Sequence, residues 1–267
     1  MKKLSLLSVA LVTIGSIGSS NAADLPAATA TQTPLPYLNW TGFYAGVNAG
    51  YGWGNNNVNF VGADPNFYSP TITFGAMPAG LRPDAHGFVG GAQAGYNFQS
   101  GPVVYGIETD IQYANIMGTA SVGTAVPGFP TILTTAQNKV DWFGTLRPRL
   151  GVTVAPAFLI YGTGGLAYGH VASSASTLVT GPAGITCANN LFCSNGSASQ
   201  TRAGWTAGAG AEYAFSGHWS AKVEYLYVDL GHETYNMPST LAPAISGMLG
   251  TTAFHEYVVR GGLNYKF

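Results

Sequence analysis

Alternation of apolar and polar residues with a period of two is the feature that most constrains the fold of this chain. In the last stretch, 257–267, odd-numbered positions are apolar, aromatic or glycine, and even-numbered positions are mostly polar. This pattern indicates an extended strand with one apolar and one polar face. Seven earlier segments resemble it, which predicts strands at 40–53, 87–98, 103–113, 140–154, 157–169, 201–215, 218–230 and 257–267.

The connections between these eight segments alternate between long and short. Long polar connections are expected at 55–84, 114–138, 171–200 and 231–253, with short turns between the other neighbours. An even strand number with this alternation is typical of an outer-membrane barrel, with both termini on the periplasmic side. The sequence therefore predicts an all-β fold, an eight-stranded antiparallel transmembrane β-barrel with four long extracellular loops.

Composition favours the membrane barrel over a soluble one. Charged residues make up 8% of the chain and hydrophobic residues 46%, whereas soluble domains carry about 25% charged residues. After the amino-terminus no apolar run approaches the roughly 18 residues of a membrane helix, so a closed barrel is the remaining way to span lipid. A soluble eight-stranded barrel with its apolar faces turned inward is the alternative fold. The formal net charge of −1 gives no basis for binding nucleic acid.

The five tryptophans support the membrane alternative. The expected topology places Trp40 and Trp219 at the periplasmic ends of their strands, and Trp53, Trp142 and Trp205 at the outer ends. None lies in the middle of a strand. Two aromatic belts at the membrane interfaces would explain this placement.

The amino-terminus indicates export. Lys2 and Lys3 precede an apolar run, and small residues at Ser20 and Ala22 suit a cleavage site, so 1–22 is predicted to be a signal peptide. The next segment, 23–40, is rich in Pro, Thr and Ala and is expected to be a flexible periplasmic lead-in. The barrel is expected to occupy 41–267.

Two motifs carry a family resemblance. The segment Ala-Asp-Leu-Pro at 23–26 and the segment Trp-Thr-Gly-Phe-Tyr-Ala-Gly at 40–46 resemble those of small alphaproteobacterial outer-membrane proteins. These are surface-antigen and haemin-binding barrels, porin-like relatives of the OmpA transmembrane domain. The resemblance implies the outer membrane of a Gram-negative bacterium, with its lipid and lipopolysaccharide as surroundings. It also implies that the terminal Phe267 is recognised by the barrel assembly machinery.

Charged residues of both signs fall on the polar faces of the expected strands. Eight strands leave a lumen just wide enough for side chains, where unpaired charges are costly. Strand positions predict that Glu108 lies near Arg149, Asp110 near Arg147, and Glu224 toward Arg260. A filled polar core is favoured over a narrow charged pore. The eight predicted interior charges are Glu108, Asp110, Arg147, Arg149, Glu212, Lys222, Glu224 and Arg260.

Cysteines and histidines give two further hypotheses. Cys187 and Cys193 in an exported chain predict a disulfide, and their spacing matches no zinc motif. Four histidines map to the outer ends of strands, where imidazole is either tolerated at a polar rim or able to bind haemin or a metal. The tolerated rim is the favoured interpretation, and haemin binding is the secondary one. The residues concerned are His86, His170, His232 and His255.

Catalytic motifs are weak. Ser and His co-occur, but no spacing pairs a nucleophile with a base, and glycines such as those at 162–165 lack the Lys-Ser/Thr of a phosphate loop. We therefore expect no enzyme and no resident cofactor. The expected function is that of a surface barrel for envelope integrity, with a haemin receptor or a narrow porin as alternatives.

Overall fold

The computed structural model describes residues 39–125, 127–128, 130–180 and 187–267. The predicted signal peptide, 1–22, and nearly all of the predicted lead-in, 23–40, lie outside the described residues. No helix among those described is long and apolar enough to cross a membrane.

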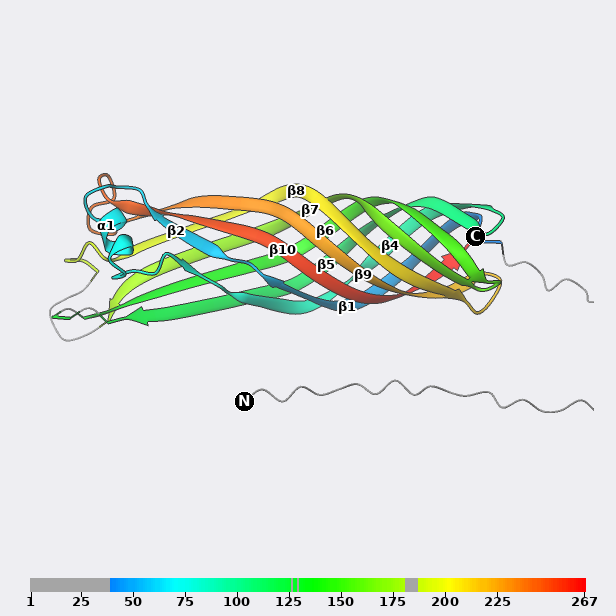
Figure 1. The fold of residues 1–267 in the computed structure, drawn as a ribbon, viewed down its shortest axis with the longest axis horizontal. Helices are drawn as coiled ribbons and strands as arrows, with labels where there is room; N and C mark the ends of the chain where they lie inside the picture. The colour runs from blue at the N-terminus through cyan, green and yellow to red at the C-terminus, as the bar shows by residue number, and fades with distance from the viewer. Residues whose placement is uncertain (1–38, 126, 129, 181–186) are drawn as a thin grey trace, which may run out of the picture. The chain divides into compact units, whose positions relative to one another are not determined.

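Eight long antiparallel strands form a closed ring (Figure 1). Each pairs with its neighbour in sequence, and β1 also pairs with β10 from Tyr44↔Lys266 to Trp53↔Tyr257. That last pairing closes the sheet, and the predicted eight-stranded barrel is confirmed. The strands are β1 (Gly42–Asn55), β4 (Asp84–Ser100), β5 (Val103–Thr124), β6 (Thr131–Ala155), β7 (Phe158–Thr180), β8 (Ser194–Ala214), β9 (Trp219–Pro238) and β10 (Gly247–Lys266).

The predicted bounds of three long loops are wrong. Most of 114–138, much of 171–200 and much of 231–253 continue the neighbouring strands. The error has a physical cause. These segments alternate hydroxyl residues with small or aliphatic ones, so their polarity suggests a loop, whereas their Thr and Val content suits a strand. The strands consequently run well past the predicted ends.

One long connection, between β1 and β4, holds additional elements. It contains β2 (Val58–Gly62), the short helix α1 (Tyr68–Thr73) and β3 (Gly80–Leu81). β2 adds to the end of β10, from Met248↔Gly62 to Thr252↔Val58, and β3 adds to β2. These elements lie at the end of the barrel opposite the carboxy-terminus (Figure 1).

In the half of the barrel nearer the carboxy-terminus, apolar side chains point outward and polar ones inward. Leu146, Leu150 and Val223 are exposed on the outer face, whereas Arg147 and Glu224 beside them are buried. This is the arrangement that lipid requires, because the outer face meets hydrocarbon and the inner face meets only protein.

The polarity of the two faces is reversed between an outward ring of aromatic residues and the end of the barrel that carries α1. Trp53, Trp142 and Trp205 lie in this ring, on β1, β6 and β8. Beyond it on β6, Gln137 is exposed and Ile132 is buried. The strands therefore present an apolar outer face to the membrane and a polar outer face past the ring, as expected where a barrel leaves lipid and enters water.

Trp40 departs from the predicted belt. Its side chain is only 5% exposed and packs with Val104, Leu159 and Ala214 inside the barrel end, whereas Trp219 is on the outer face. Gly42 begins β1 with a φ of 144°, which residues with a Cβ rarely adopt. The chain thus enters β1 through an unusual bend, and Trp40 belongs to the interior rather than to the interface.

Pro148 produces the predicted irregularity without moving the register. The ladder between β6 and β7 runs to Leu146↔Leu166 and resumes at Arg149↔Thr163 in the same register. Proline has no N–H to donate, so a short break is expected. The carbonyl of Pro148 still accepts a hydrogen bond from Thr163 Oγ1, at 2.9 Å.

Arginine at an outward position below the aromatic ring is predicted to destabilise the barrel. Leu146→Arg or Val223→Arg places a charge against hydrocarbon and should lower the free energy of unfolding in lipid by roughly 2–4 kcal/mol. Gln137→Arg, on the outer face past the ring, is the matched control and should change stability little. Urea unfolding in lipid vesicles measures all three, and equal effects at Leu146 and Gln137 would contradict the membrane placement.

Candidate functional site

Eight charged side chains meet inside the membrane-spanning half of the barrel. They come from five strands, β5, β6, β8, β9 and β10, and each is at most 3% exposed. Strand alternation places them on the inner face, between outward apolar neighbours. They are the set predicted from sequence, with four acidic and four basic members, so their formal charges cancel: Glu108, Asp110, Arg147, Arg149, Glu212, Lys222, Glu224 and Arg260.

Two ion pairs of this network follow directly from strand register. Glu224 on β9 lies opposite Arg260 on β10, with 2.5 Å between Glu224 Oε2 and Arg260 Nη2. Asp110 Oδ2 on β5 lies 2.9 Å from Arg147 Nη2 on β6. Side chains on the same face of neighbouring strands are within reach of one another, so the pairing of adjacent strands is enough to bring both pairs together.

Glu108 lies near Arg149, as predicted, but its nearer partner on β6 is Arg147. The ladder sets Glu108 opposite Arg147, with 2.8 Å between Oε1 and Nη2. The predicted partner, Arg149, is farther away, with 3.8 Å between its Nη1 and Glu108 Oε2, and it binds Glu212 on β8 at 2.7 Å. Counting from strand ends misplaced the register because β6 continues beyond its last pair with β5, Val103↔Val152.

Further contacts of the network cross the lumen. Lys222 Nζ on β9 lies 2.8 Å from both carboxylate oxygens of Glu108 on β5. These strands are on opposite sides of the ring. Arg260 Nη2 on β10 also lies 2.7 Å from Asp110 Oδ2 on β5. The charged side chains therefore bridge the barrel from wall to wall.

Two tyrosines belong to the network, and sequence analysis did not single them out. Tyr44 Oη donates to Glu108 Oε2 at 2.8 Å, and Tyr161 Oη donates to Glu224 Oε1 at 3.1 Å. The guanidinium of Arg149 lies 3.9 Å from the centre of the Tyr161 ring. Tyr44 falls on the same alternating positions as the inward glycines of its strand, so its inward orientation could have been predicted. Around Tyr161 the alternation is too irregular for such a prediction.

An apolar layer covers the network on the side facing α1. On β10, Val258 precedes Arg260 by two positions, and on the antiparallel β9, Leu226 comes two positions after Glu224, so both lie on the α1 side of the network. Both pack into one buried cluster with Phe143 and Phe254. A second buried cluster lies farther along, formed by side chains of β2, α1, β6, β7, β9 and β10. Buried polar side chains also lie among these clusters: on β10, Glu256 stands between Val258 and Phe254 in sequence, and Asn56 Nδ2 donates to its Oε1 at 2.7 Å. The interior thus holds the eight-charge network nearer the carboxy-terminus, and apolar clusters with some buried polar groups beyond it.

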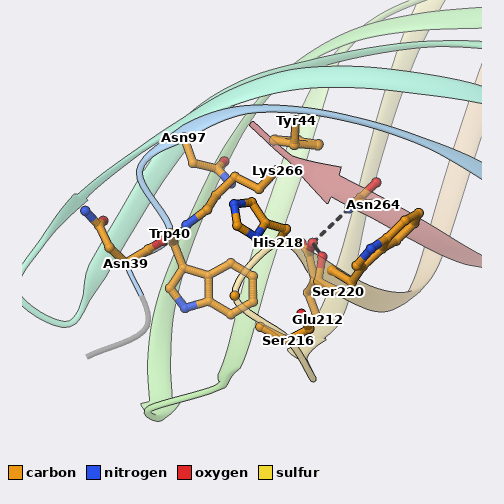
Figure 2. Close-up of a pocket in the computed structure, with 13 residues that line it drawn as sticks. Asn39, Trp40, Tyr44, Asn97, Glu212, Ser216, His218, Ser220, Asn264 and Lys266 are labelled. Carbon is orange, nitrogen blue, oxygen red and sulfur yellow. Dashed lines mark hydrogen bonds between the residues drawn. The ribbon is translucent and has the colours of Figure 1, made fainter. Parts of the chain in front are cut away.

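The opposite mouth of the barrel is nearly filled as well. Figure 2 shows Trp40, His218 and Lys266 around a cavity of about 20 Å³, with Glu212 deeper in it. Ser220 Oγ and Asn264 Nδ2 both donate to Glu212 Oε1, at 2.5 and 2.8 Å. A cavity of this size holds about one water molecule, so it is a gap in packing rather than an entrance.

At the end of the barrel that carries α1, Asp64 accepts hydrogen bonds from two separate segments. The backbone N–H of Phe67 donates to Asp64 Oδ1 at 2.6 Å, and the N–H of Gly247 donates to Oδ2 at 3.4 Å. Burial alone would raise the pKa of the Asp64 carboxyl, but these backbone hydrogen bonds outweigh it and lower that pKa. The charged carboxylate therefore joins the β1–β4 connection to the start of β10.

The predicted disulfide between Cys187 and Cys193 is confirmed. The loop it closes packs against α1: Tyr68 Oη donates to the carbonyl of Leu191 at 2.5 Å, and the rings of Phe67 and Phe192 are 4.9 Å apart. The disulfide loop and α1 thus cover the same end of the barrel together.

The four histidines do not converge on one site. All lie on outward positions: His86 on β4, His170 on β7, His232 on β9 and His255 on β10. The rings of His232 and His255 are 6.1 Å apart, whereas the other two stand on separate strands elsewhere round the ring. Within the described residues, no cluster of three or more His, Cys, Asp or Glu side chains could hold a metal ion. The four histidines thus share no pocket, and haemin binding stays a prediction.

The carboxy-terminal residue is accessible. Phe267 is 70% exposed, its N–H donates to the carbonyl of Phe43 at 3.0 Å, and the two rings are 5.4 Å apart. Its recognition by the assembly machinery stays a prediction.

Comparison with known proteins agrees with this architecture. The chain is 37% identical over 269 residues to the 31 kDa outer-membrane immunogenic protein of Brucella melitensis, which covers all of both chains. It is 30% identical over 211 residues to the 22 kDa outer membrane protein of Rhizobium leguminosarum bv. viciae, over 79% of this chain and 74% of that one. Among solved structures, OprG from Pseudomonas aeruginosa is similar at 13% identity, with a TM-score of 0.46, over 86% of this chain and 97% of that one.

The family profile described as "Outer membrane protein beta-barrel domain" matches residues 20–267. With its relatives, this match places the chain in the bacterial outer membrane and confirms the resemblance to alphaproteobacterial surface proteins. The protein belongs to the outer membrane protein beta-barrel family.

Proposed function

We propose that the protein acts as a sealed barrel that reinforces the outer membrane and presents its extended strands at the cell surface, without conducting solutes. The observation that carries this proposal is the charged network across the lumen, in which Lys222 reaches Glu108 from the opposite wall. A channel needs a continuous path of water, and side chains that bridge the lumen leave none at this level.

Electrostatics supports a structural role for the network. A charge moved out of water into a narrow protein interior is costly, and the cost is offset only when partners and hydrogen bonds are well placed. The side chains of Arg147 and Arg260 are 0% exposed, and each contacts more than one carboxylate. Balanced and mutually bonded charges favour one fixed arrangement, whereas a conducting pore needs charged groups that face mobile ions.

Closure at several levels supports the same proposal. Above the network, Val258 and Leu226 belong to a buried cluster of packed apolar side chains. Below it, Trp40 fills the periplasmic mouth, and its backbone N–H donates to Gln99 Oε1 at 2.8 Å. A solute would have to displace packed side chains at both places.

A deletion strain separates the sealed barrel from the narrow porin. If the protein reinforces the envelope, its loss should make cells more sensitive to detergents and to large antibiotics, while uptake of small hydrophilic solutes stays unchanged. Plasmid-borne wild-type protein should restore resistance. Reduced uptake of small solutes with unaltered detergent resistance would contradict the proposal and favour the porin.

Conductance of the purified barrel gives an independent test. In planar lipid bilayers, the wild-type protein should show no stable, ion-selective openings, because its lumen is bridged by side chains. A general porin reconstituted in the same way controls for insertion. Reproducible ion-selective conductance from the monomer would overturn the sealed lumen.

A double-mutant cycle tests whether the network is coupled. Glu224→Ala or Arg260→Ala alone leaves a buried charge with fewer partners and should lower the free energy of unfolding by several kcal/mol, whereas the pair should cost less than the sum of the two. The measurement is urea unfolding in lipid or detergent. Strictly additive effects would show that the two side chains do not stabilise each other.

A further inference from the structure

We propose that the outer face of β5–β8, above the aromatic ring, binds the saccharide part of outer-leaflet lipopolysaccharide. This inference rests on the position of the barrel in the outer membrane and not on its being sealed. The surface concerned is a regular array of hydroxyl and amide side chains, called here the hydroxyl grid. The four strands that carry it lie side by side and extend toward the α1 end (Figure 1).

The first row of the grid crosses all four strands at one level of the ladder. Thr119 on β5 pairs with Gln137 on β6, Gln137 with Ser174 on β7, and Ser174 with Ser197 on β8. Because neighbouring strands are about 4.8 Å apart, four side chains in register span about 14 Å. This length suits a short run of sugar rings.

The second row lies two residues farther from the membrane. It consists of Ser121, Thr135, Ser176 and Asn195, again paired in sequence across the four strands. Ser121 Oγ and Thr135 Oγ1 are 2.9 Å apart and share a hydrogen bond. Two parallel rows give the grid two dimensions, and they border a shallow hollow of about 520 Å³.

The chemistry of the grid is neutral and rich in donors and acceptors. None of its eight side chains is charged or aromatic, and most point outward beside solvent. Hydroxyl and amide groups both donate and accept hydrogen bonds, as sugar hydroxyls do. An apolar partner would find no complementary group here, whereas sugar hydroxyls would find a donor or an acceptor at each position.

The height of the grid above the membrane fits the saccharide. Gln137 lies five residues along β6 from Trp142, in the aromatic ring. With a rise of about 3.3 Å per residue and a strand tilt of about 40°, Gln137 in the first row stands about 13 Å above Trp142. The polar headgroup layer of one leaflet is only about 5–7 Å thick. The grid therefore stands above the lipid headgroups, at the level of the sugars attached to them.

The barrel wall changes character beyond β8, which bounds the site. The ladder between β8 and β9 stops at Trp205↔Asp229. Above it, Arg202 on β8 forms an ion pair with Glu233 on β9, and Ser194 forms an isolated bridge with Ser239. On the far wall, Thr234 and Thr251 are outward but hydrogen-bond to each other, at 3.1 Å. With Asn59 of β2, which pairs with Thr251, they form a shorter polar row outside the grid and provide a control for it.

The test is an NMR titration of the folded barrel in detergent micelles, with amide resonances as the readout. The probe is the delipidated saccharide released by mild acid from lipopolysaccharide of the host strain. Shifts should concentrate at 119–121, 135–137, 174–176 and 195–197. The variant Gln137→Ala/Ser174→Ala/Ser176→Ala should bind about tenfold more weakly, because three side chains that can hydrogen-bond to the saccharide are removed.

Controls make the outcome decisive. The variant Thr234→Ala/Thr251→Ala should retain wild-type affinity, and heat-modifiable migration on a gel verifies that each variant is folded. Purified lipid A, which keeps the acylated and phosphorylated disaccharide but lacks the saccharide attached to it, should leave the grid resonances unchanged. Equal affinity of the grid variant and the wild type, shifts spread evenly over the extracellular surface, or binding that requires lipid A would each overturn the proposal.

Discussion

Pairing of the first strand with the last is the interaction on which the rest of the structure depends. Lipid offers no hydrogen bonds, so each backbone N–H and C=O that crosses it must be bonded within the protein. The ladder from Tyr44↔Lys266 to Trp53↔Tyr257 removes the two edges that an open sheet would leave. Closure at eight strands in turn makes the lumen narrow, so inward side chains meet across it.

Both the layered interior and the inverted outer face follow from this ring. In the lipid-spanning half, polar residues can only face inward, where the lumen brings Glu108 and Lys222 from opposite walls into contact. Past the aromatic ring the surroundings are aqueous, and the same strands place Gln137 outward and Ile132 inward. One continuous sheet thus has an outer face suited to lipid on one side of Trp142 and an outer face suited to water on the other.

The sequence predicted strands and their buried faces correctly where neighbouring residues differ strongly in polarity. Alternation of residues such as Leu146 and Arg147 identifies both a strand and its buried face, and the parity of eight charges predicted the network. It failed above the ring, where segments such as 131–138 alternate hydroxyl with small or aliphatic residues and the contrast is low. Contacts across the lumen were also missed, because Arg260 and Asp110 become neighbours only when the ring closes. Trp40 was misplaced because its position depends on the bend at Gly42 rather than on a periodic pattern.

The central claim is that each long strand passes from lipid into water at the aromatic ring, and spin-label accessibility along β6 tests it most directly. Single nitroxides would be placed at the outward positions Leu150, Leu146, Gln137 and Thr135, with both native cysteines replaced by serine. In lipid vesicles, labels at Leu150 and Leu146 should be relaxed mainly by oxygen, and labels at Gln137 and Thr135 by a water-soluble nickel chelate. The crossover should fall near Trp142. Relaxation by the nickel chelate at all four positions would contradict the account.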